Sequence, residues 1–222
     1  MQEHCWSTIE RLLLDAAVPR FGELSYGPDG LATRAAAHEV PYVAANLYAA
    51  GADKPFFPRF LFREFDGLQI AIIGVVGYDM HRLLSSSDQA LWRIEDPAVS
   101  IQAAVEQIRR QLGRRPDVTI LLVASDTASF SRIDAGNLVD VVIGDSDGID
   151  PREIWRIAHV APGSPDSALY SGPLHIARAS EESVTHLAIH FEPREGAPPL
   201  LESVQQWTLP VLETGPRDVS TS

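Results

Sequence analysis

Short apolar runs recur along the chain, each bounded by glycine, proline or charged residues. Such runs are typical of strands buried inside a sheet. The clearest ones are Val40–Leu47, Leu68–Val76, Val118–Val123 and Val139–Ile143. Phe60–Phe65 instead alternates apolar and polar residues, as a half-buried strand does. The dipeptide Asp66-Gly67 follows it and predicts a two-residue hairpin turn into the next strand.

Segments with helical periodicity lie between several of these strands. Asp96-Pro97 is a typical helix start, and the segment Ala98–Leu112 places Ile101 and Ile108 on one face. The glycines and the proline of Phe21–Gly30 predict a loop. Three further helices are expected at Thr8–Ala17 (after a capping box), Leu31–Glu39 and Ser131–Leu138.

The C-terminal part predicts two antiparallel strands, Leu169–Ala177 and Ser183–Phe191, joined at Ser180–Glu182. Helix and strand alternate in the middle of the chain, with hairpins on either side. This order predicts an α/β fold with one mixed β-sheet or two sheets. We expect one domain over residues 1–193 and a C-terminal tail over residues 194–222.

Charge and composition narrow the classes of partner. The 222 residues carry a formal net charge of −12 at pH 7, which repels phosphate backbones, so we expect no nucleic-acid partner. No apolar run approaches the ~20 residues of a membrane span, and no signal peptide is recognisable. The expected location is therefore the cytoplasm, or an extracytoplasmic compartment if the chain is truncated at its N-terminus. The single cysteine, Cys5, excludes an internal disulfide.

Several segments in a fixed order carry a family resemblance. They are Glu23–Gly27 (ELSYG), Pro41–Leu47 (PYVAANL), Phe65–Gly74 (FDGLQIAIIG), Val139–Gly144 (VDVVIG) and Tyr170–Phe191. Together with Asp117–Val123, which precedes Val139–Gly144, their order and spacing resemble the metallophosphoesterase domain of the 5′-nucleotidase family, within the calcineurin-like superfamily. The resemblance implies an α/β fold in which mixed β-sheets are sandwiched by helices, here without the first strands. Three residues stand as remnants of that family's motifs: Glu23, Asn46 and Gly144.

The resemblance implies a metal-dependent chemistry, which requires ligand residues at particular positions of this chain. The family holds two divalent metals with Asp, His and Asn, and such a pair polarises a phosphate and generates a hydroxide nucleophile. At aligned ligand positions this chain carries Phe21, Gly22, Ala124, Ser146 and Gly148. The first strands of the family fold, with their own ligands, are expected to precede Met1. We therefore expect a non-catalytic scaffold or interaction subunit that binds no cofactor.

The expected loss of those first strands also predicts a partner. A sheet that lacks its leading strands has an open edge, whose unpaired backbone groups attract another chain. We expect a protein partner or a second copy of the chain to cover this edge.

An acidic cluster supplies the alternative function. Asp145, Asp147 and Asp150 follow a buried strand, and Asp126 follows the neighbouring one. Together they would place carboxylates at the carboxyl edge of the sheet, where α/β proteins bind ligands. A rebuilt site of this kind would hold Mn, Zn, Fe or Ca and hydrolyse phosphoesters such as nucleotides. The other interpretation is an acidic surface loop.

Histidines offer a second possible metal site. His186 and His190, at even spacing, would share one face of a strand, and His175 would lie on the predicted hairpin partner. Three imidazoles on one face suit zinc. Solvent-facing strand histidines are the competing interpretation.

Overall fold

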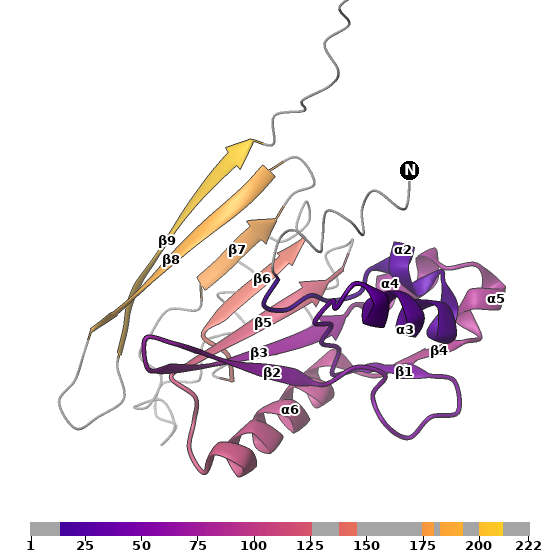
Figure 1. The fold of residues 1–222 in the computed structure, drawn as a ribbon, viewed down its shortest axis with the longest axis horizontal. Coiled ribbons are helices and arrows are strands. Elements are labelled where there is room, and N and C mark those ends of the chain that lie inside the picture. The colour runs from indigo at the N-terminus through magenta and orange to yellow at the C-terminus, as the bar shows by residue number, and fades with distance from the viewer. Residues whose placement is uncertain (1–13, 126–137, 146–174, 180–182, 193–199, 211–222) are drawn as a thin grey trace, which may run out of the picture.

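The computed structural model describes residues 14–125, 138–145, 175–179, 183–192 and 200–210 (Figure 1). Its helices are α2 (Phe21–Leu24), α3 (Gly27–Ala37), α4 (Tyr78–Leu83), α5 (Ser86–Gln89) and α6 (Pro97–Leu112). Its strands are β1 (Leu47–Ala49), β2 (Phe60–Phe65), β3 (Leu68–Val76), β4 (Trp92–Ile94), β5 (Val118–Ala124), β6 (Val141–Asp145), β7 (His175–Ala179), β8 (Ser183–Glu192) and β9 (Leu200–Pro210). Among the described residues, no helix is long and apolar enough to cross a membrane.

A five-stranded sheet in the order β2-β3-β5-β6-β7 forms the centre of the described structure (Figure 1). β2 and β3 form an antiparallel hairpin, while β3, β5, β6 and β7 run parallel. Asp66 and Gly67 both have positive φ, 50° and 79°, as a two-residue hairpin turn matched to strand twist requires. The predicted hairpin and the α/β class with mixed sheets are confirmed.

Helix α6 covers one face of this sheet and forms the larger core with it. Its buried residues include Ile101, Ala104 and Ile108, which pack with Ile73 and Leu121 of the sheet. The Asp96 carboxylate caps the helix by accepting from the backbone N–H groups of residues 98 and 99, and Gly113 ends it with φ 69°. The predicted helix is therefore confirmed, with a start one residue earlier.

A second core lies beside the end of β3, between α2, α3, α4 and the β1–β4 pair (Figure 1). Trp92 of β4 is 4 % exposed, and its indole N–H donates to the carbonyl of Leu24 in α2 at 2.9 Å. Val76, the last residue of β3, belongs to this cluster. The second core therefore fixes the helices against the carboxyl end of the sheet.

Some expected elements differ from the observed ones. The predicted loop Phe21–Gly30 is helical over α2 and the start of α3, because Pro28 lies in the first turn, where a missing N–H costs nothing. The predicted helix Thr8–Ala17 does not reach its last residues: Ala17 forms a parallel bridge with Tyr42 instead. The expected helix Ser131–Leu138 lies almost wholly outside the described residues.

The segment Val40–Leu47 was expected to be a buried strand, but it is an irregular extended segment until β1 begins at Leu47. Its backbone crosses β3 so closely that Gly74 has no room for a side chain. A Cβ added there would lie 2.2 Å from the Val43 carbonyl oxygen and 2.7 Å from Val43 Cγ2. Ala45 N–H donates to the Gly74 carbonyl at 2.7 Å, which ties the two segments together.

The side-chain amide of Asn46 forms further hydrogen bonds at the end of β3. Its Oδ1 accepts from the Val76 N–H at 2.9 Å, while its Nδ2 donates to the Val76 carbonyl at 2.7 Å and to the Glu95 carbonyl at 3.1 Å. Asn46 is fully buried. A primary amide presents one acceptor and two donors. The Asn46 side chain therefore forms the two hydrogen bonds with Val76 that a neighbouring strand would otherwise form. Asn46 also joins β3 to the residue that follows β4.

The C-terminal strands pair differently from the expectation. The predicted antiparallel pairing of Leu169–Ala177 with Ser183–Phe191 is wrong: β7 joins the central sheet parallel to β6, and β8 pairs antiparallel with β9. β9 lies within the expected tail, residues 194–222, so a strand of the tail pairs with a strand of residues 1–193. Strand alternation alone does not specify a partner, because the same apolar pattern suits either neighbour.

We predict that Gly74→Ala lowers the free energy of unfolding by about 2–3 kcal/mol, because the backbone of Val43 must move away from β3. Gly22→Ala is the matched control: a Cβ there meets nothing within 4 Å. It should stay within ~1 kcal/mol of the parent. Urea unfolding of both variants measures the difference, and equal stabilities would contradict the close approach.

We predict that Asn46→Asp lowers stability by about 3 kcal/mol at pH 8, because a buried carboxylate cannot donate to the two carbonyls that Asn46 Nδ2 reaches. Burial should raise the pKa of the new carboxyl above its unfolded value. The folded state then binds the proton more tightly, so the loss should be smaller at pH 4 than at pH 8. The exposed Gln111→Glu is the control, and the same loss at both pH values would contradict the role of the donors.

Candidate functional site

The carboxyl ends of the parallel strands meet at one edge of the central sheet. In α/β folds this edge is where ligands bind. Gly77 follows β3 and begins the turn into α4, and its N–H donates to the carbonyl of Ala124 in β5 at 2.7 Å. Ser125 follows β5, and Asp145 ends β6. This edge is therefore the candidate functional site.

A buried hydroxyl–carboxylate pair lies at its centre. Ser125 Oγ is 2.9 Å from each carboxylate oxygen of Asp79 and donates to it. Ser125 is 2 % exposed and Asp79 is 7 % exposed. A Cβ on Gly77 would lie 2.3 Å from Asp79 Oδ1 and 2.8 Å from Ser125 Oγ, so only glycine fits between the strand and the pair.

Asp79 is the site residue that sequence reasoning missed. Its signal in the sequence is small: Gly77 and Asp79 follow a buried strand, with an exposed Tyr78 between them. The spacing of Asp79 and Ser125 in the sequence does not indicate that their side chains are in contact. The parallel pairing of β3 with β5 brings them together.

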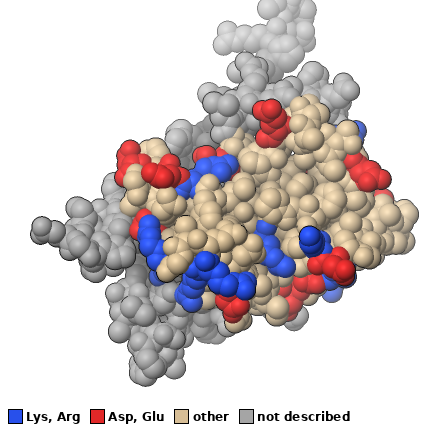
Figure 2. Space-filling view, turned by 60° about the horizontal axis from the view of Figure 1, so that its bottom comes forward, with Lys and Arg blue, Asp and Glu red and all other residues tan. Residues whose placement is uncertain are grey.

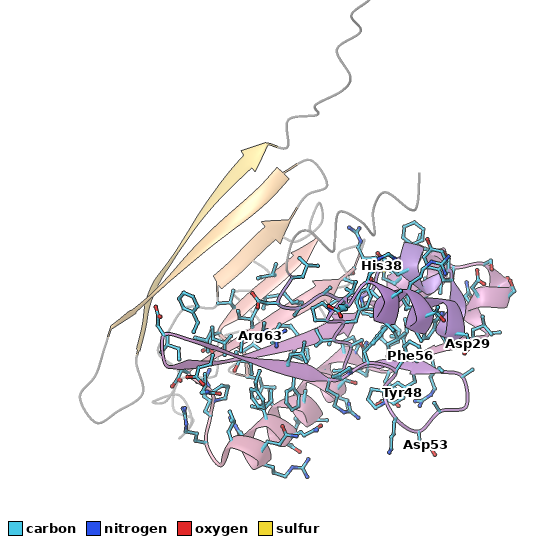
Figure 3. The ribbon with its side chains drawn as sticks, viewed as in Figure 1. Asp29, His38, Tyr48, Asp53, Phe56 and Arg63 are labelled. Atoms are coloured by element: carbon cyan, nitrogen blue, oxygen red, sulfur yellow. The ribbon has the colours of Figure 1, made fainter. Side chains whose placement is uncertain are left out.

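A polar network borders the site on the side of β1 and β4. Arg59 donates to the Tyr48 hydroxyl at 3.2 Å and to the Ala45 carbonyl at 2.9 Å, and the guanidinium of Arg93 lies 4.1 Å from the centre of the Tyr48 ring. Burial, followed by the hydrogen bond to Glu95, raises the pKa of Tyr48, although Arg59 acts in the opposite direction. Tyr48, the middle residue of β1, is labelled in Figure 3. The phenol therefore stays protonated at neutral pH and accepts a hydrogen bond from the Arg59 guanidinium.

Glu23, one of the motif remnants, has a local role in α2. Its Oε2 accepts from the backbone N–H of Arg20 at 3.0 Å and so caps the helix. Tyr42, 4 % exposed, lies near it: burial first, then the charge of Glu23, raises the pKa of the Tyr42 phenol above its usual range. The carboxylate of Glu23 is thus engaged by the backbone of its own helix.

The other expected site residues are placed only in part. Asp145 is the last residue of β6, opposite Ala179 of β7, and Gly144 pairs with Val123. Asp126, Asp147 and Asp150 lie outside the described residues, as do Ser146 and Gly148. The rebuilt acidic site therefore stays a prediction.

The predicted histidine site loses its geometric basis. His186 and His190 are both on β8, whose partner is β9, and His175 is on β7 beside β6. β7 and β8 belong to different sheets among the described strands, so the three histidines do not lie on one hairpin.

The described ligand positions do not suit the dinuclear metal centre that the resemblance implies. Phe21, Gly22 and Ala124 carry no ligand atom in their side chains. The Glu23 carboxylate is used by its own helix, and Asn46 Oδ1 accepts from Val76. In the part of the chain that the structure describes, no three His, Cys, Asp or Glu side chains form a group suited to a metal ion.

Comparisons with known proteins identify the fold. No family model matches the sequence, and no curated protein matches it. Among solved structures, sulfate thiohydrolase SoxB from Thermus thermophilus, in complex with glycerol, matches with a TM-score of 0.65 and 14% identity, over 92% of this chain and 34% of that chain. The calcineurin-like phosphoesterase YfkN from Bacillus subtilis matches with a TM-score of 0.66 and 14% identity, over 92% of this chain and 66% of that one.

A 5′-nucleotidase precursor from Thermus thermophilus matches with a TM-score of 0.63 and 18% identity, over 92% of this chain and 40% of that chain. This chain thus spans between 34% and 66% of the length of these three proteins. Such identities establish the fold alone. The chain has the metallophosphoesterase-like α/β fold found in 5′-nucleotidases and calcineurin-like phosphoesterases.

Proposed function

We propose that this chain is a non-catalytic scaffold or interaction subunit, which keeps a metallophosphoesterase-like fold without its dinuclear metal site. The observation that carries the proposal is the replacement of ligand residues by apolar ones at the described positions. Phe21 stands 45 % exposed at the start of α2, beside Gly22, and Ala124 ends β5 with 5 % exposure. A benzyl group, a hydrogen atom and a methyl group offer no lone pair to a divalent cation.

The polar groups that remain at the edge of the sheet also support the proposal. Ser125 and Asp79 bond to each other, and the amide of Asn46 bonds to backbone groups at the end of β3. These contacts stabilise the ends of β3 and β5. A catalytic group instead has to present its lone pair or proton to a substrate.

A protein partner or a second copy is the expected binding partner, and β2 is the strand that it would extend. β2 is the first strand in the described order of the central sheet. Phe65 at its end is 67 % exposed. Figure 2 shows basic and acidic side chains next to one another on the α6 side, so neither sign of charge dominates that surface.

The second candidate is a divalent-metal-dependent hydrolase of phosphoesters, with a rebuilt site formed by Asp126, Asp145, Asp147 and Asp150. One observation favours it: Asp145 ends β6 at the same sheet edge as Ser125 and Asp79. Mn, Zn, Fe or Ca would be held by carboxylate oxygens there, and the metal would supply Lewis acidity toward a phosphate.

Elemental analysis combined with a phosphoesterase assay separates the two candidates. The purified chain, dialysed without chelator, is analysed for Mn, Zn, Fe and Ca, and tested on bis-p-nitrophenyl phosphate and on a 5′-nucleotide with added Mn²⁺. We expect less than one tenth of a metal equivalent, and no hydrolysis above that of the Asp145→Ala variant.

Asp53→Ala, in an exposed loop, is the matched control for the loss of one carboxylate. Stoichiometric metal, with hydrolysis that Asp145→Ala abolishes and Asp53→Ala retains, would overturn the scaffold proposal. That result would establish the hydrolase.

A further inference from the structure

The backbone of β2 has an outer edge that faces away from β3. Among the described strands, β2 pairs only with β3, and the register places Phe65 opposite Leu68 next to the turn (Figure 1). In a two-residue hairpin this first pair is hydrogen-bonded, and hydrogen-bonded and non-hydrogen-bonded pairs then alternate along the strands. Phe60, Phe62 and Glu64 therefore direct their backbone N–H and C=O groups to the outer edge.

The contacts of this outer edge leave room for another strand. The Phe62 carbonyl accepts from the side chain of the next residue, Arg63, at 2.9 Å. Within the described part of the chain, no backbone group bonds to the outward N–H groups of Phe62 and Glu64. Glu64 and Phe65 are exposed, so the end of β2 is accessible to solvent. An edge of this kind is a template for strand addition.

The charges along β2 are complementary to a second copy of the same strand. Arg59, just before the strand, is basic, whereas Glu64 and Asp66 at its other end are acidic. Antiparallel pairing of two copies brings the basic start of one strand to the acidic end of the other. Residues 59–66 carry two basic and two acidic side chains, while the whole chain has a net charge of −12. Repulsion between two copies is therefore weak along this strip.

We propose that two copies of this chain pair antiparallel through β2, centred on Phe62, so that their central sheets become one continuous sheet. In this register Phe62 is opposite Phe62 of the second copy, and Phe60 is opposite Glu64 of the second copy. These are the residues whose backbone groups face outward, so each pair forms two hydrogen bonds. A register centred on Arg63 would instead place two guanidinium groups opposite each other, which is unfavourable.

The exposed Phe65 also gains a partner in this register. It lies opposite Arg59 of the second copy, and a guanidinium is attracted to the face of an aromatic ring. One pair of short strands buries less surface than a standard protein interface, so we expect a weak dimer with a dissociation constant in the micromolar range. This inference rests on the proposed interaction role of β2 and names a second copy as the partner.

Sedimentation velocity of the chain over the micromolar range tests the dimer. Phe65→Lys places a cation opposite Arg59 of the second copy and should raise the dissociation constant about tenfold. Leu83→Lys is the matched control, because Leu83 is an apolar residue of α4 with 51 % exposure. It should change the dissociation constant less than about twofold. A monomer at every concentration, or equal effects of the two variants, would overturn the proposal.

Hydrogen exchange measured by NMR tests the surface and the register. The amides of Phe62 and Glu64 should exchange about fivefold more slowly in the dimer than in dilute protein. Those of Leu61 and Arg63, which bond to β3, and that of Asp53 in an exposed loop should not change. A dimer without slower exchange at Phe62 and Glu64 would overturn pairing through β2.

Failure of this proposal is distinguishable from failure of the scaffold proposal. A monomeric chain without metal or hydrolysis would overturn the β2 dimer and leave the scaffold with a different protein as its partner. Stoichiometric metal with hydrolysis would overturn the scaffold, whereas the exchange at β2 would still report whether two copies pair.

Discussion

The side-chain amide of Asn46 is the interaction on which the organisation of the carboxyl edge depends. β3 extends beyond the end of its hairpin partner β2, so its last residues need hydrogen-bond partners from elsewhere. The backbone of Ala45 satisfies Gly74, and the amide of Asn46 satisfies both polar groups of Val76. The third bond of the amide, to Glu95, connects this edge to the residues that begin α6. A single fully buried side chain thus connects the end of β3 to the segment between β4 and α6.

This arrangement gives the polar residues of the edge structural roles. Ser125 and Asp79 hold the end of β5 against the start of α4, and Gly77 leaves the space that the pair occupies. Glu23 caps α2, and the Tyr48 hydroxyl accepts from Arg59. The fold shared with SoxB and the 5′-nucleotidase precursor therefore carries, at the described positions, side chains suited to internal bonding. This is the physical basis for proposing a scaffold with that fold.

The two faces of the central sheet differ in the elements that pack against them. Each α/β unit must bury both faces of its parallel strands, and α6 covers only one of them. The second core covers the opposite face near Val76, at the carboxyl end of β3. Further along the strands this face is partly buried: Ile120 and Leu122 are half-buried, whereas Val118 and Val141 are buried.

The sequence by itself determined the elements whose signals are local. The bounds of β2 and β3 follow from alternation, an apolar run and the turn at Asp66-Gly67, and α6 follows from its cap and its apolar stripe. Only the tertiary structure decided what long-range contact controls: the irregular path of Val40–Leu47, the partners of β7 and β8, and the meeting of Asp79 with Ser125. The physical reason is that hydrogen bonds between distant segments depend on which surfaces pack together, and a local pattern of apolar residues suits several partners equally well.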